Sequence, residues 1–169
     1  LTTIFGLGLW YKLSNYLSKK VCWSLGILIA IMGLFVFCQI VPGDESLVLL
    51  MISMVILAFG LGVFSIFPAS VLTDIIDYGT WKYEASHAGS YFSTYTFFMK
   101  GSLALGGVLG LGIAGGFGFD ASATSHSEES VFGLYLSLVY LPGIFYLLAI
   151  VFVLLIPINE RGHKIIRRR

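Results

Sequence analysis

Charged residues are scarce in this sequence. Asp, Glu, Lys and Arg make up 11% of its 169 residues, whereas about 25% is typical of a soluble globular domain. Hydrophobic residues make up 57% of the chain, and the mean hydropathy is +0.92. This composition excludes an ordinary soluble fold and indicates an integral membrane protein.

Cysteine and histidine are also rare, which limits the chemistry available. Cys22 and Cys38 share one apolar run, where a helix would separate them by about 24 Å, too far for a disulfide. His87, His126 and His163 fall in different connecting segments on opposite sides of the membrane, so they cannot form one metal site. The sequence contains no phosphate-binding glycine loop, nucleophile motif or zinc-ligand spacing. We therefore expect neither a metal centre nor an enzyme.

Long charge-free runs predict membrane-spanning helices, and no period-2 alternation indicates strands. The first nine residues are apolar but too short to span, so we expect them to end a helix that begins upstream in a longer chain. Pro68 is expected to bend the second spanning run. The expected all-α segments are the helix end at 1–9, spanning helices at 21–41, 47–74, 89–116 and 131–156, and a tail at 157–169.

The connecting segments alternate in the sign of their charge. Two of them, 42–45 and 118–130, carry acids and contain no Lys or Arg. Outside the spanning runs, every base lies in the other segments: Lys12, Lys19, Lys20, Lys82, Arg161, Lys164, Arg167, Arg168 and Arg169. The positive-inside rule makes their side cytoplasmic. Topological anchoring explains the terminal arginines better than nucleic-acid or anionic-lipid binding, and we expect no nucleic-acid partner.

Lys100 is the only charged residue between Ala85 and Phe119. A helix from about Gly89 places it about 16 Å from the helix start, near the middle of a hydrocarbon layer about 30 Å thick. A lysine at this depth either snorkels to the interface or faces a polar cavity or partner, and its short stem favours the second reading. Ser93 and Thr96 share its helical face.

Small residues extend the same helix, with spacing that permits close contact with a neighbouring helix. They are Gly106, Gly110 and Ala114.

Asp74 and Asp77 stand three residues apart at the expected cytoplasmic end of the second spanning helix. Carboxylates at a helix C-terminus oppose the helix dipole, so we expect bases from another segment to compensate them. Lys82 is close in sequence, and partners outside this chain are an alternative. A merely solvated helix end remains the other interpretation.

Two stretches of the sequence resemble a known transporter family. They are Asp-Ile-Ile-Asp-Tyr-Gly-Thr-Trp-Lys from Asp74 and Tyr-Phe-Ser-Thr-Tyr-Thr-Phe-Phe-Met-Lys-Gly from Tyr91. The chain resembles the glycoside–pentoside–hexuronide:cation symporters of the major facilitator superfamily. The resemblance implies twelve helices with both termini cytoplasmic. This chain would then provide the end of helix eight and helices nine to twelve, and an N-terminal half would be missing.

The resemblance also implies roles for individual residues. Lys100 matches a lysine near the sugar and cation sites, and Thr96 and Tyr95 match positions that line the cavity. Asp74 and Asp77 match a cytoplasmic network that closes the inward side, with Lys82 nearby.

The sequence departs from the family pattern at two places. The family often has an arginine where this chain has Ser86 and His87. Ser65 replaces a tryptophan found in the family, so Phe64 or Phe67 would have to provide a sugar-stacking surface.

The expected function is symport of a sugar or glycoside with Na⁺ or H⁺ by alternating access, in the inner cell membrane and with the tail cytoplasmic. No cofactor is expected beyond the transported ion, whose acidic ligands would lie in the missing half. The alternatives are a transporter of the same fold for a lipid or other non-sugar solute, and a non-transporting membrane module. A membrane-embedded enzyme would need acids, His or Cys clustered at one depth, which this sequence lacks.

Overall fold

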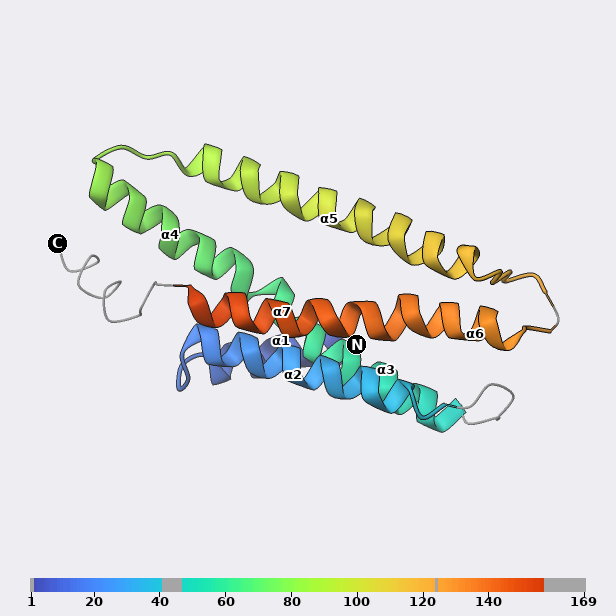
Figure 1. The fold of residues 1–169 in the computed structure, drawn as a ribbon. Helices are drawn as coiled ribbons and strands as arrows, with labels where there is room; N and C mark the ends of the chain where they lie inside the picture. The colour runs from blue at the N-terminus through green and yellow to red at the C-terminus, as the bar shows by residue number, and fades with distance from the viewer. Residues whose placement is uncertain (1, 41–46, 124, 157–169) are drawn as a thin grey trace.

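The computed structural model describes residues 2–40, 47–123 and 125–156 (Figure 1). The turn expected at 42–45 and the basic tail at 157–169 lie outside this described part. Within it, every regular element is a helix, and four stretches are long and apolar enough to span a membrane. These are Lys19–Phe37, Leu47–Tyr83, Ala88–Gly116 and Glu128–Leu155. The all-α expectation and the four predicted spans are confirmed.

Nine helical elements follow one another in the described part of the chain, because two of the four spans are interrupted. The elements are α1 Thr2–Leu13, α2 Lys19–Phe37, α3 Leu47–Leu61, the 3₁₀ turn η1 Gly62–Ser65, α4 Phe67–Tyr83, α5 Ala88–Gly116, α6 Glu128–Tyr135, the π turn η2 Leu136–Tyr140 and α7 Leu141–Leu155.

The second span breaks where the sequence predicted a bend. η1 interrupts the α-helix, and Pro68 stands in the first turn of α4, where its missing N–H costs no hydrogen bond. Beyond this break, α4 does not end at residue 74 but continues to Tyr83, because polar residues remain helical after the apolar run ends. The helix stops where Glu84 adopts a left-handed backbone, with φ of 52°.

Close packing of α2 on α3 forms the centre of the structure. A Cβ added to Gly60 would lie 2.4 Å from the backbone nitrogen of Ala30, and one added to Gly33 would lie 2.7 Å from that of Leu57. These distances require glycine, because any side chain would push the two helices apart. The close contact predicted at Gly106 is not found among the described residues, since a Cβ there meets no atom within 4 Å.

Gly110 is as open as Gly106, whereas Ala114 is buried. The predicted small-residue stripe is therefore packed only at its last member.

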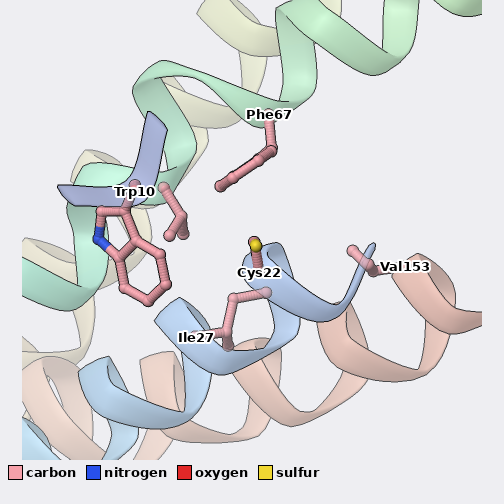
Figure 2. Close-up of a cluster of buried hydrophobic side chains, with 6 residues drawn as sticks. Trp10, Cys22, Ile27, Phe67 and Val153 are labelled. Carbon is pink, nitrogen blue, oxygen red and sulfur yellow. The ribbon is translucent and has the colours of Figure 1, made fainter. Parts of the chain in front are cut away.

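A buried apolar cluster holds α1 and α7 against this pair (Figure 2). Trp10 follows the helix end expected at 1–9, but α1 extends past it to Leu13, and the Trp10 side chain is 2% exposed. The indole Nε1 donates a hydrogen bond to the carbonyl of Phe59 at 3.1 Å. The cluster also contains Cys22, and neither described cysteine is in a disulfide, as predicted. Its members are Trp10, Cys22, Ile27, Val63, Phe67 and Val153.

α5 lies on the outer side of this assembly (Figure 1). It contacts α4 near its start, and α6 and η2 near its end. Most α5 side chains between these two contacts are exposed in the described structure.

Candidate functional site

Lys100 is the thirteenth of the 29 residues of α5, close to the middle of the helix. Its side chain is exposed, and no ion pair joins it to a carboxylate of the described residues. A rise of 1.5 Å per residue puts Lys100 about 18 Å from the helix start. A cation at this depth in lipid requires a polar cavity or an anionic partner.

The face of α5 that carries Lys100 contains two hydroxyl side chains. Thr96 is one turn before the lysine and Ser93 nearly two turns before it, both exposed. The Ser93 hydroxyl donates a hydrogen bond to the carbonyl of Ser90 at 3.0 Å, within its own helix. Thr96 is therefore the more available of the two for a ligand.

Tyr95 lies on a different face of α5 from Lys100. Five residues separate the two positions, which is about 140° around a helix of 3.6 residues per turn. Tyr95 is half-buried and lines a groove between α4 and α5. The structure therefore does not bring Tyr95 and Lys100 together into one site.

Asp74 forms an ion pair with Lys19. The sequence had pointed to Lys82, or to a base outside this chain, as the partner of Asp74. The Nζ of Lys19 lies 2.6 Å from Oδ2 of Asp74, and the Asp74 side chain is 12% exposed. Lys19 is the first residue of α2, so the carboxylate also lies near the positive end of that helix dipole. Because α4 continues to Tyr83, Asp74 is inside its helix rather than at the C-terminus, and the expected conflict with the dipole of α4 disappears.

Asp77 and Lys82 complete the set expected at this end of the molecule. Asp77 is half-buried on α4, whereas Lys82 is exposed in the last turn of α4. The Nζ of Lys82 lies 5.3 Å from the ring centroid of Tyr83, a cation–π distance. The carboxylate of Asp74 thus takes its base from α2 and not from Lys82.

The residues considered for sugar stacking are used in packing instead. Phe67 is 1% exposed inside the apolar cluster, so it cannot offer a ring face to a ligand (Figure 2). Phe64 packs edge-on against Trp23 and tilted against Tyr146, with centroids 6.4 and 6.2 Å apart. Ser65 is the exposed side chain at this break in the helix.

The bases of the described residues outside α5 collect at one end of the bundle. Lys20 donates a hydrogen bond to the carbonyl of Ile156, which joins the start of α2 to the end of α7. At the opposite end, the Tyr135 hydroxyl donates to the carbonyl of Ile40. The segment between α4 and α5 lies at the end that holds the start of α2, whereas the acidic segment between α5 and α6 lies at the other (Figure 1). This arrangement agrees with the sidedness expected from the charges.

A comparison with protein families identifies the family of this chain. Residues 1–160 match the family model described as MFS/sugar transport protein, which covers nearly the whole chain. The chain belongs to the MFS/sugar transport family. A comparison with curated proteins returned no significant match.

Membership indicates a multi-pass membrane transporter of the major facilitator type. Sequence reasoning about this transporter missed Lys19 as the partner of Asp74. The available signal was the basic pair Lys19 and Lys20, which had been used only to assign the cytoplasmic side. Both lysines stand directly before a spanning helix, at the same end of the molecule as the acids on α4. That position could have predicted a pair between Lys19 and Asp74.

Proposed function

We propose that this chain is the C-terminal part of a sugar or glycoside:cation symporter that works by alternating access. The observation that carries the proposal is Lys100, a single cation midway along a spanning helix and exposed on a face with Thr96. The MFS/sugar transport family supports a sugar as solute. The N-terminal half of the same fold would provide the carboxylates that bind Na⁺ or H⁺, and α2 to α7 would correspond to helices nine to twelve.

Lys100 would link the solute to the ion through its charge. A buried ammonium stabilises a nearby carboxylate as the anion, and a bound cation competes with the ammonium for that carboxylate. When the ion binds, the ammonium can turn toward hydroxyl groups of the solute. Occupancy of one site therefore favours occupancy of the other.

The Lys19–Asp74 pair would act as a gate at the cytoplasmic end. It joins α2 to α4, which is separated from α3 by the break at η1. An ion pair that holds α4 against α2 can close the inward side and release it when broken. We place Asp77 and Lys82 in the same cytoplasmic network.

Transport by the full-length chain in proteoliposomes tests the proposal. A panel of sugars and glycosides is offered under an inward Na⁺ or proton gradient, with lysophospholipids and amino acids as the alternative solutes. We expect at least one sugar or glycoside to accumulate above equilibrium, and an ionophore that collapses the gradient to abolish the accumulation. Accumulation of a non-sugar solute alone, or uptake that ignores both gradients, would overturn the proposal.

A further inference from the structure

A groove of about 790 Å³ lies between α4 and α5, next to the segment that connects them. At its side, the added Cβ of Gly79 would lie 3.1 Å from the hydroxyl oxygen of Tyr91, so the missing side chain lets the two helices meet there. The eight lining residues come from both helices and their connection: Leu72, Tyr83, His87, Ser90, Tyr91, Thr94, Tyr95 and Phe98.

This groove is separate from both sites already described. Its lining on α5 recurs every three or four residues, and Lys100 is about 180° around the helix from Tyr91. On α4, Asp74 is likewise about 160° from Leu72. The groove therefore lies opposite the Lys100 face of α5 and opposite the ion-paired face of α4.

The chemistry of the groove changes along its length. Tyr83, His87 and Ser90 stand at the helix ends and provide hydroxyl and imidazole groups. Leu72 and Phe98 lie deeper in the groove. Along the axis of α5, Phe98 is about 12 Å further in than Ser90. A polar mouth at the level of the headgroups and an apolar interior at the level of the acyl chains match one amphipathic molecule.

We propose that this groove binds one membrane phospholipid, from the leaflet at the Lys19–Lys20 end of the bundle. The phosphate would accept hydrogen bonds from the hydroxyl and imidazole groups at the mouth, and one acyl chain would lie along Leu72 and Phe98. A sugar fits less well, because the deep end of the groove at Leu72 and Phe98 offers no hydrogen-bond partner to its hydroxyl groups. The lipid would hold α4 and α5 together as one unit beside the break at η1.

Native mass spectrometry of the delipidated full-length transporter, titrated with phosphatidylglycerol or phosphatidylethanolamine, tests this site. Thr94→Trp and Ser90→Phe each fill the groove, and Val108→Trp adds the same bulk to an exposed position of α5 outside it. We expect the wild-type protein and Val108→Trp each to bind one added phospholipid tightly. Both filling variants should bind it at least tenfold more weakly, with thermal melting confirming that they are folded. The two lipids distinguish a preference for an anionic headgroup from recognition of the phosphate alone.

Unchanged lipid affinity in a folded filling variant would overturn the proposal. A second readout remains if both variants fail to fold. Phospholipid should protect Thr94→Cys from a thiol reagent in a background without other cysteines. Protection by a sugar or glycoside but not by phospholipid would assign the groove to solute and also overturn the proposal.

Discussion

Lys19 and Asp74 connect the first residue of α2 to the interior of α4 through an Nζ–Oδ2 distance of 2.6 Å. The aspartate side chain is 12% exposed and the lysine 29%, so the pair is partly shielded from water. Removing one partner of such a pair costs roughly 1–3 kcal/mol, between the values for exposed and fully buried pairs. That is enough to bias two conformations of a transporter, and weak enough to break during each transport cycle.

We predict that Asp74→Asn in the full-length protein opens the end of the bundle that holds Lys19. Loss of the carboxylate charge removes the ion pair between α2 and α4, and a bias of roughly 1–3 kcal/mol changes the ratio of two states by about five- to 150-fold. The measurement is the rate at which a thiol reagent labels Thr96→Cys from the cytoplasmic side.

Two variants control this prediction. Lys12→Gln removes an exposed base from the last turn of α1, outside this network, and should leave the labelling rate unchanged. The exchanged pair Lys19→Asp with Asp74→Lys should restore part of the closed population. Equal labelling of wild type and Asp74→Asn would show that the pair is not a gate.

The sidedness of the connecting segments predicts opposite labelling of two introduced cysteines. Ser18→Cys, beside Lys19, should react from the cytoplasm, whereas Ser125→Cys, in the acidic segment between α5 and α6, should react from outside. The measurement uses a membrane-impermeant reagent on intact cells and on inside-out vesicles, in a background without other cysteines. Reaction of both cysteines from the same side would contradict the helix assignment.

The close contact of α2 and α3 predicts that Gly60→Ala destabilises the protein. The new methyl group would lie 2.4 Å from the backbone nitrogen of Ala30, so the helices must separate at a cost of about 1–3 kcal/mol. Thermal melting of the full-length transporter in detergent measures the loss. Gly106→Ala is the matched control, because its methyl group meets no atom of the described structure within 4 Å. A larger loss from Gly106→Ala than from Gly60→Ala would mean that the glycines of α5 form the tighter contact.

Sequence patterns predicted the spans well because membrane helices are set by long apolar runs. The expected helix at 89–116 matches Ala88–Gly116 almost residue for residue. Charges were a poorer guide to where helices end, since α4 continues through Asp74, Asp77 and Lys82 to Tyr83. Leaving the apolar layer does not break a helix; the left-handed turn at Glu84 does.

The sequence could not predict the contacts between helices. Glycines at 26, 33 and 60 and those at 106 and 110 look alike in sequence, yet only the first set is packed in the described structure. Phe67 was considered for sugar stacking and is buried in the apolar cluster. Which face of α4 turns inward depends on its packing against the other helices, and the apolar run in the sequence does not specify it.

The most direct test of the account is cation-driven accumulation by Lys100→Ala, measured in the full-length transporter and normalised to the amount in the membrane. We predict normal insertion and thermal melting, but loss of accumulation against a gradient, because the charge that links ion and solute is gone. Lys100→Arg should restore little, since a planar guanidinium does not replace a compact ammonium. Accumulation of sugar by Lys100→Ala at the wild-type level would contradict the account and make Lys100 a structural residue.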